Sequence, residues 1–401
     1  MTRPAALLMT CAVLCAALAM GLRQSFGLFL APMTEAHGWG ASGFAFAIAL
    51  QVLLNGVSQP ICGQIADRVG GRVVIMGGAA LYALGILGMA LTDGLPLFTF
   101  FAGLVMGVAV SAAGMPVIIA SLTRLLPEAQ RGRAVGLGTA GSSFGQFLVV
   151  PLAQLGIITA GWQGALFLMA GAALLMIPLA LPLNDQPAAP AAGTTEETAG
   201  EALRRAFRTP TFWFLFFGFF VCGVHVSFLS VHLPGFVAWC GLHAAVGAGA
   251  IALIGLFNVV GSLVAGELSS RWKRRELLVA IYAARGVLMA GFMLVEKTAG
   301  TVLVFSALMG LLWLSTVPPT VALVARNFGT RWLATIFGLV FLGHQIGGFT
   351  GAFLGGLVFD RTGSYDLMWS FAIAMAAFAA LVHLPVRDGM TPGGAPATKA
   401  A

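Results

Sequence analysis

Long apolar stretches, separated by short polar segments, make up almost all of this 401-residue chain. A helix needs about 20 apolar residues to cross a hydrocarbon core of roughly 30 Å. Twelve stretches have about this length, at residues 5–32, 42–66, 73–92, 96–122, 132–157, 163–183, 210–236, 244–269, 277–295, 300–325, 332–358 and 366–386. The pattern predicts an all-α membrane protein with twelve transmembrane helices.

Lys and Arg residues gather in every second gap between these stretches. Seventeen of the 21 lie in such gaps or at the chain ends: Arg3, Arg68, Arg72, Arg124, Arg131, Arg133, Arg204, Arg205, Arg208, Arg271, Lys273, Arg274, Arg275, Arg326, Arg331, Arg387 and Lys399. The other gaps contain only Lys297 and Arg361. Cytoplasmic loops of membrane proteins are rich in Lys and Arg, so we expect both termini to be cytoplasmic.

Charged residues are scarce, at 9% of the chain, against roughly 25% in a typical soluble protein. The formal net charge is +7, and topology explains it, because the basic residues lie in loops between apolar spans. We therefore expect the lipid bilayer, and not nucleic acid, as a partner. The first residues, up to Ala19, also fit a signal peptide, but the apolar run continues to Pro32, which favours a first span.

The two halves of the chain resemble each other. The aligned pairs, at offsets of 202 or 203 residues, include Arg23 and His225, Pro32 and Pro234, Asn55 and Asn258, Pro116 and Pro318, and Gly145 and Gly347. A segment rich in Ala, Pro, Thr and Glu separates the halves and is typical of a flexible linker. The expected organisation is a six-helix half at 1–183, a cytoplasmic linker at 184–209, a second six-helix half at 210–388 and a cytoplasmic tail at 389–401.

A sequence rich in Gly and Arg follows the second stretch. Residues 63–72 read Gly-Gln-Ile-Ala-Asp-Arg-Val-Gly-Gly-Arg, and residues 266–275 repeat the pattern with Ser270 at the position of the aspartate. This sequence resembles the signature of the major facilitator superfamily between helices 2 and 3. The resemblance implies two pseudo-symmetric six-helix halves and commonly a monomer. It also implies gating residues at the cytoplasmic mouth, namely Asp67, Arg68, Arg72 and Arg271.

Two further segments give a narrower resemblance. Residues 37–40, His-Gly-Trp-Gly, and residues 359–366, Phe-Asp-Arg-Thr-Gly-Ser-Tyr-Asp, resemble the bacterial monocarboxylate transporter-like branch, which is related to oxalate/formate antiporters. This implies transport of small organic anions across the cell inner membrane, often together with protons. Relatives commonly carry a substrate-binding arginine in helix 8, but residues 244–269 contain no cation. The counter-charge for an anion must therefore come from another helix.

Two arginines, Arg23 and Arg285, lie inside apolar stretches, whereas all fourteen Asp and Glu residues lie in loops or near the ends of stretches. A buried cation is costly unless it is paired or hydrated. The planar guanidinium fork matches a carboxylate, so we expect Arg23 to bind an anionic substrate. Bonding to backbone carbonyls or to Gln24 is the alternative. Arg285 fits a substrate-binding or a structural role.

Histidine titrates near neutral pH and is the natural proton carrier where no carboxylate is available. We expect His225 to face the cavity, with His232 two turns further along the same face, and His344 lies in the eleventh stretch. Each also fits a hydrogen-bonded core residue. The remaining candidates are polar residues in other stretches: Gln51, Gln146, Asn258 and Gln345 for substrate binding, and Asn55 for gating.

The sequence contains no ATP-binding loop, catalytic triad or metal-ligand cluster that we recognise. We therefore expect a secondary carrier that uses no cofactor, is not an enzyme, and works by alternating access about a central site. Two alternatives remain open. One is an exporter of larger amphipathic compounds, although residues 141–146 lack the Gly-Pro element of drug/proton antiporters. The other is a membrane sensor that binds a ligand without moving it.

Overall fold

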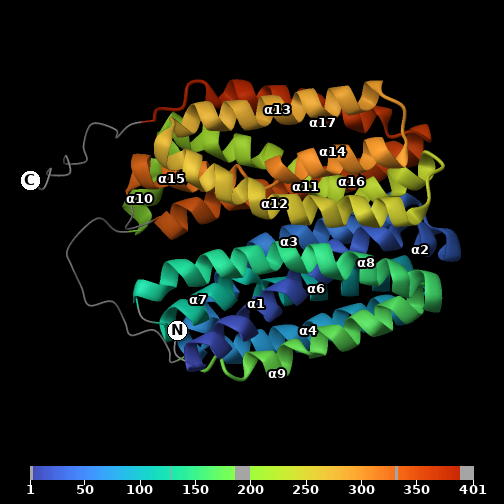
Figure 1. Ribbon diagram of the computed structural model, residues 1–401, viewed down its shortest axis with the longest axis horizontal. Helices are drawn as coiled ribbons and strands as arrows, with labels where there is room; N and C mark the ends of the chain where they lie inside the picture. Colours follow the sequence, from blue (N-terminus) through green and yellow to red (C-terminus); the bar gives the residue numbers. More distant parts are fainter. Residues whose placement is uncertain (1–2, 127, 186–198, 330–332, 389–401) are drawn as a thin grey trace, which may run out of the picture.

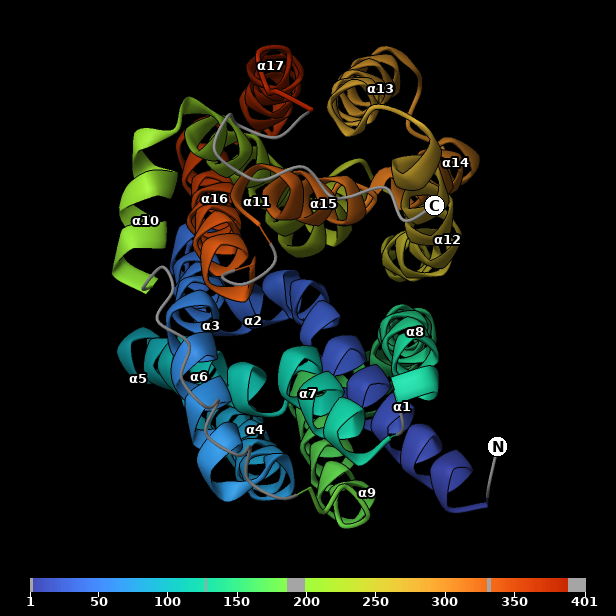
Figure 2. The same cartoon turned by 90° about the vertical axis from the view of Figure 1, so that its left-hand side faces the viewer.

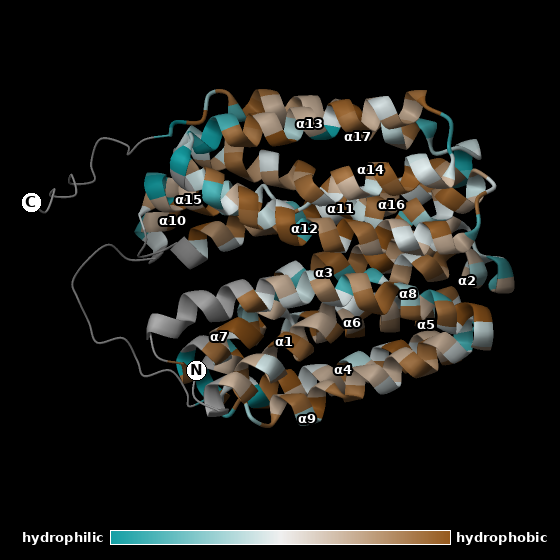
Figure 3. Ribbon diagram, viewed as in Figure 1, coloured by the Kyte–Doolittle hydropathy of each residue, from teal (hydrophilic) through white to brown (hydrophobic). Residues whose placement is uncertain are grey.

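The structure, a computed structural model, describes residues 3–126, 128–185, 199–329 and 333–388 (Figure 1). Within these ranges every regular element is helical. Eleven segments are long and apolar enough to cross a membrane, and the longest of them, Ala140–Ala180, contains two spans. The described part of the chain therefore has the twelve transmembrane helices that the sequence predicts. Most of the hydrophilic residues gather at the two ends of the helices, and the middle is hydrophobic (Figure 3).

The first six-helix half extends from blue to green in Figure 1. Its elements are α1 (Arg3–Gln24), η1 (Phe26–Phe29), α2 (Leu30–His37), α3 (Ala41–Val69), α4 (Gly71–Leu91), α5 (Leu95–Thr99), η2 (Phe100–Val105), α6 (Met106–Ala112), α7 (Met115–Leu125), α8 (Glu128–Leu174) and α9 (Met176–Ala180). Transmembrane helix 1 continues from α1 through α2, and transmembrane helix 4 runs from α5 to α7.

The long element α8 contains transmembrane helices 5 and 6. Gly161 divides it with φ 72° and ψ 172°, a conformation that glycine adopts easily because it has no Cβ. The two parts fold back on each other, since a Cβ added at Gly156 would lie 3.3 Å from the Cβ of Ala165. This turn accounts for the difference between the eleven continuous segments and the twelve spans.

The second half repeats this order, from yellow-green to red in Figure 1. Its elements are α11 (Pro210–Trp239), α12 (Ala244–Arg271), α13 (Arg274–Leu294), α14 (Ala299–Leu312), α15 (Val317–Phe328), α16 (Leu333–Thr362) and α17 (Asp366–His383). Transmembrane helix 10 consists of α14 and α15. It is interrupted at residues 313–316, as transmembrane helix 4 is interrupted at residues 113–114. Pro116 and Pro318 begin the helices after these breaks, because proline suits a first turn, where its missing N–H costs nothing.

Small residues set the closest helix contacts in each half. A Cβ added at Gly145 would collide with the carbonyl oxygen of Ala17 on α1, and one added at Gly347 would collide with that of Phe220 on α11. The absence of a side chain lets the backbones approach closely, as membrane helix contacts often require. The aligned glycines therefore build equivalent contacts in the two halves.

The two halves lie side by side with their helices roughly parallel, and a view from the end that carries the termini separates them clearly (Figure 2). They are joined at the opposite end. There Asp360, on α16, accepts hydrogen bonds from the backbone N–H groups of Ala41 (2.9 Å) and Ser42 (2.8 Å) at the start of α3. A carboxylate is well placed at a helix N-terminus, where backbone N–H groups lack partners. The ribbons of α8 and α12 diverge towards the termini (Figure 1).

Part of the expected flexible linker is helical. Ala199–Arg208 form α10, whose Ala202 and Ala206 are fully buried. Arg205 donates a hydrogen bond of 3.0 Å to the carbonyl oxygen of Phe328 at the end of α15. A cation is favourable at a helix C-terminus, so α10 is held against the second half. Residues 186–198 of the expected linker lie outside the described residues.

Candidate substrate-binding site

Glutamine side chains connect the two halves near the middle of the helices. Gln146 donates a hydrogen bond of 2.8 Å to the carbonyl oxygen of Ile251 on α12, and its own oxygen lies 3.2 Å from the amide nitrogen of Gln24. The contact is close because Gly255 faces it: an added Cβ there would lie 2.8 Å from the Cγ of Gln146. Gln146 therefore joins α1, α8 and α12.

A second glutamine makes the corresponding connection on the other side. Gln345 donates a hydrogen bond of 2.8 Å to the carbonyl oxygen of Val52 on α3, and its oxygen lies 3.0 Å from Nδ1 of His344. Gly56 leaves the space for it, since an added Cβ would lie 2.6 Å from the Cγ of Gln345. The ring of His344 stacks on Phe341, at 5.6 Å and 4°. His344 is thus one hydrogen bond away from the contact between the halves.

The two asparagines of the repeat have different partners. Asn258 donates to the hydroxyl of Ser143 across the contact between the halves (3.0 Å) and accepts from the backbone N–H of Leu314 at the break in transmembrane helix 10 (3.0 Å). Asn55 accepts from Ser111 inside the first half (2.9 Å). Asn258 therefore connects α12 to α8 and to the break in transmembrane helix 10, whereas Asn55 connects α3 to α6.

Arg23, the arginine expected to bind the substrate, lies in the last turn of α1 beside Gln24 and near Tyr82. Its side chain is partly exposed. It forms no hydrogen bond or ion pair with any residue in the described ranges, Gln24 and backbone carbonyls included. Its guanidinium therefore keeps its hydrogen-bond donors available for a ligand or for water.

Arg285 is different, because it is fully buried and bonded to the backbone. Its Nε and Nη2 donate to the carbonyl oxygen of Leu312 at 3.2 and 2.6 Å, and Nη2 also donates to that of Trp313. These carbonyls end α14, where the helix dipole favours a cation. The contacts place Arg285 in a capping position at the break in transmembrane helix 10.

Two histidines of α11 bond to neighbouring helices of their own half. Nε2 of His225 lies 2.9 Å from the carbonyl oxygen of Ala372 on α17, and Nε2 of His232 lies 2.7 Å from that of Ala352 on α16. Because a carbonyl only accepts, Nε2 carries the hydrogen in both rings. The expectation that His225 faces the central cavity stays a prediction. Gln51 is also buried, and its amide nitrogen has no described partner.

The expected gating residues occupy the end that carries the termini. Arg68 is exposed and Arg72 is partly exposed. Arg271 forms an ion pair of 2.6 Å with Glu267, one turn away on α12. The side chain of Asp67 lies outside the described residues, so its predicted role stays a prediction.

Sequence reasoning missed two aspartates at this end. Asp185 accepts hydrogen bonds from the backbone N–H of Gly71 (2.7 Å) and from Nε of Arg124 (2.7 Å). Asp388, 203 residues later, accepts from the backbone N–H of Arg274 (2.6 Å). Each caps the third transmembrane helix of its half, and the shared offset is the signal that could have identified the pair.

The fold and the site together define a class of protein. Two parallel six-helix halves, discontinuous helices and a polar layer between the halves form the architecture of a secondary transporter. The comparison with known families agrees: the model of the Major Facilitator Superfamily matches residues 12–352. The chain belongs to this family of transporters, and it is a multi-pass membrane protein.

Similar proteins cover most of the chain. The uncharacterized MFS-type transporter YcxA of Bacillus subtilis (strain 168) is 24% identical over an alignment of 383 positions that covers 90% of this chain and 90% of its own. Human monocarboxylate transporter 11 is 26% identical and covers 92% of this chain with 79% of its own. Rat monocarboxylate transporter 13 is 27% identical, with 92% and 86% covered.

Solved structures support the fold. The bacterial homologue of the human lysosomal transporter Spinster, in an inward-facing and unoccupied conformation, has a TM-score of 0.76 at 14% identity and covers 98% of this chain with 100% of its own. The D-xylose-proton symporter has the same TM-score at 16% identity, with 95% and 96% covered. At these identities the likeness concerns the fold alone.

Proposed function

We propose that this protein is a secondary carrier of small organic anions, with monocarboxylates as the substrate class, coupled to protons. The observation that carries the proposal is Arg23, a guanidinium in a transmembrane helix that has no described hydrogen-bond or ion-pair partner. Bringing an anion to such a cation offsets the cost of keeping it in the membrane. The names of the human and rat relatives support the same substrate class.

Arg23 binds the carboxylate through its planar fork, which offers two parallel N–H donors. The neighbouring Gln24 and Gln146 position the substrate, because they connect α1 to α12 of the opposite half. Arg285 acts structurally in this proposal, since backbone carbonyls at the end of α14 already use its Nε and Nη2.

Proton coupling in this proposal involves His344. Its Nδ1 faces the oxygen of Gln345, whose nitrogen bonds to Val52 in the other half. Protonation makes both ring nitrogens donors and strengthens the bond to Gln345. The charge on His344 thereby acts on a contact that rocking of the halves must break and remake. His225 and His232 each keep one ring nitrogen without a described partner and are the further candidates.

The test is uptake of labelled mono- and dicarboxylates into proteoliposomes, with and without an inward proton gradient. Wild-type protein should take up at least one monocarboxylate, and the gradient should stimulate uptake. Arg23→Gln should weaken the apparent affinity about 10- to 100-fold, because a hydrogen bond to a charged group contributes roughly 1.5–3 kcal/mol. Arg361→Gln, which removes an exposed arginine at the far end of α16, is the matched control and should transport normally.

The experiments test the substrate class, the anion site at Arg23 and the coupling through His344 separately. If folded wild-type protein takes up no anion, the substrate class is wrong. If Arg23→Gln transports as well as wild type, the anion site lies elsewhere. His344→Gln should lose stimulation by the gradient but retain exchange of labelled for unlabelled anion. Equal stimulation in that variant would remove His344 from the coupling.

A further inference from the structure

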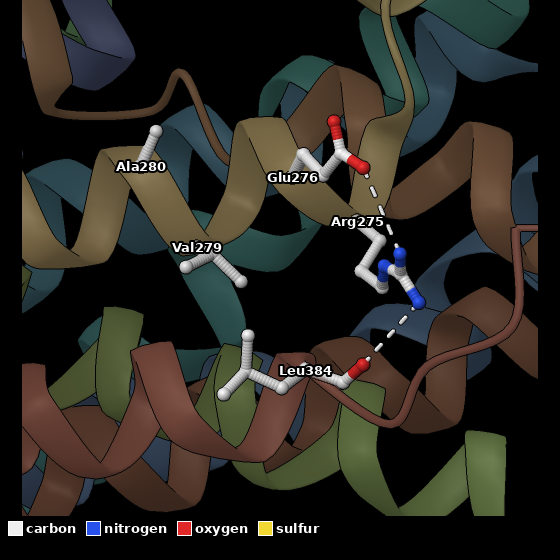
Figure 4. A pocket seen from close by; sticks show the side chains of 5 residues that line it. All are labelled: Arg275, Glu276, Val279, Ala280 and Leu384. Carbon is white, nitrogen blue, oxygen red and sulfur yellow. Dashed lines mark hydrogen bonds and ion pairs between the residues drawn. The ribbon is translucent and has the colours of Figure 1, made fainter.

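A groove opens between α13 and α17 at the end of the molecule that carries the termini. It has a volume of about 410 Å³ and is lined by Arg275, Glu276, Val279, Ala280 and Leu384. Figure 4 shows Val279 and Leu384 facing each other across the groove, with Arg275 at one end of it. The groove thus has apolar walls and a cation at its mouth.

The groove lies at the rim of the helix bundle. α13 and α17 are neighbours at the edge of the second half in both views (Figures 1 and 2). Both are long and apolar enough to cross a membrane. The groove lies between the first turns of α13 and the residue after the end of α17, where hydrocarbon gives way to lipid headgroups. Leu384 is 53% exposed and Ala280 is also exposed, so these surfaces face the surrounding lipid.

Arg275 is only loosely held by the protein. Its guanidinium lies 3.4 Å from the carbonyl oxygen of Leu384 and 3.6 Å from the carboxylate of Glu276. Both distances exceed those of good charge-assisted hydrogen bonds. Its side chain is 35% exposed. An anion with closer geometry can therefore replace these contacts.

The surroundings of Arg275 are rich in cations. Arg271, Lys273 and Arg274 precede it in the turn between α12 and α13. Arg271 has a close carboxylate partner, Glu267, at 2.6 Å, whereas the guanidinium of Arg274 lies 3.6 Å from the carboxylate of Asp388. Lys273 shares Glu276 with Arg275, at 3.2 Å. Two cations thus compete for one carboxylate at the mouth of the groove.

We propose that this groove binds an anionic phospholipid of the leaflet on this side, which the charge pattern predicts to be cytoplasmic. The phosphate lies on Arg275 with Lys273 beside it, and one acyl chain fills the space between Val279, Ala280 and Leu384. Basic residues at the cytoplasmic end of membrane helices attract anionic headgroups, and pockets of this kind between helices hold them. The proposal does not depend on which substrate the protein carries.

Glu276 gives the proposal an internal check. Its carboxylate repels a phosphate and occupies the same two cations. Removing that charge should therefore strengthen lipid binding, whereas removing Arg275 should weaken it. If this surface only contacted bulk lipid, the two substitutions would not change lipid binding in opposite directions.

The experiment is native mass spectrometry of the full-length protein, which counts retained lipids in micelles doped with phosphatidylglycerol or phosphatidylcholine of the same chain length. Wild type should retain phosphatidylglycerol in preference. Arg275→Gln should lower its retention about fivefold, the effect of one basic residue near an anionic surface. Glu276→Gln should raise it. Ala280→Phe, or the milder Ala280→Leu, should lower retention of both lipids by filling the groove.

Arg361→Gln, at the opposite end of the molecule, is the matched control and should retain both lipids as wild type does. Size-exclusion profiles establish that each variant is folded. Retention of phosphatidylglycerol unchanged by both Arg275→Gln and Ala280→Phe would overturn the proposal. So would full displacement by inorganic phosphate at millimolar concentration, because the site would then recognise a free anion and not a lipid.

Discussion

The two halves carry their intramembrane cations in different helices of the same repeat. In the first half Arg23 lies in transmembrane helix 1, and the tyrosine Tyr82 occupies helix 3. In the second half the aligned residues are His225 in helix 7 and Arg285 in helix 9. Arg23 has no described hydrogen-bond partner, whereas Arg285 caps the broken helix 10. The two intramembrane arginines, at different positions of the repeat, therefore have unlike surroundings.

This difference shows how a fold uses a cation in the membrane. A guanidinium that meets the carbonyls at a helix end is stabilised by the protein itself. A guanidinium without such partners needs water or a ligand. The first half has the second kind, so it is the half to which we assign the substrate anion, and the second half uses its arginine to hold a discontinuous helix.

The ends of the halves show a second contrast. Asp185 is completely buried and pairs with Arg124 at 2.5 Å, while it also caps α4. Asp388 caps α13 in the same way, but its closest cation is 3.6 Å away, on Arg274. The repeat preserves the helix cap, and at these two caps the described residues form a close ion pair in the first half and a longer one in the second.

The largest expected effect tests whether Arg285 stabilises the fold and Arg23 does not. Arg285→Leu leaves the buried carbonyls of Leu312 and Trp313 without their donors, and each unsatisfied group costs roughly 1–3 kcal/mol. We expect the free energy of unfolding to fall by about 2–5 kcal/mol, measured by thermal or denaturant unfolding in micelles. The same substitution at Arg23 should change it by less than about 1 kcal/mol. Equal losses at both positions would show that Arg23 is structural as well.

Neutralising Asp185 and Asp388 tests whether the two helix caps contribute differently to stability. Asp185→Asn removes the charge of a buried carboxylate, its 2.5 Å ion pair with the partly buried Arg124 and part of the cap of α4, and should cost about 3 kcal/mol. Asp388→Asn loses a longer ion pair and part of one cap, so about 1 kcal/mol is expected. Unfolding of both variants in the same micelle measures the difference. A larger effect at Asp388 would contradict the contrast between the two ends.

The smallest expected effect concerns a contact that both halves share, a tyrosine hydrogen bond between their first and third helices. Tyr82 donates a hydrogen bond to the carbonyl oxygen of Ala19 (2.9 Å), and Tyr282 donates one to that of Gly218 (2.6 Å). Each connects the third helix of its half to the first. Tyr82→Phe and Tyr282→Phe should each cost about 0.6 kcal/mol, the average for hydrogen bonds between membrane helices. Clearly unequal losses would show that these two contacts are not equivalent.

Much of the fold could be predicted from the chain alone. The lengths of the apolar stretches predicted twelve spans, and the aligned prolines Pro116 and Pro318 now stand directly after the breaks in helices 4 and 10. The aligned Gly145 and Gly347 form equivalent close contacts. These features depend on local properties, namely helix length, proline chemistry and the size of a side chain, which the sequence states directly.

The site could be predicted only in part. The sequence identified Arg23, Gln146 and Gln345 as polar residues inside spans, but it did not say which of them join the two halves. It led us to expect His225 at the cavity from its position in helix 7, but it did not predict that Nε2 of this ring bonds to the carbonyl oxygen of Ala372 on α17. The rotation of a helix about its own axis depends on all the helices packed around it, and no local pattern reports that.

The sequence by itself therefore determined the membrane-spanning character, the two repeated halves and the transporter family. The lipid environment imposes these through hydrophobic length and loop charge, which are properties of short segments. Only the tertiary structure decided that Arg285 caps a broken helix, that Asp185 and Asp388 hold the helix starts, and that Arg23 lacks a described partner. Hydrogen bonds between helices join residues that are distant in the chain, so their pairing depends on how the helices are packed.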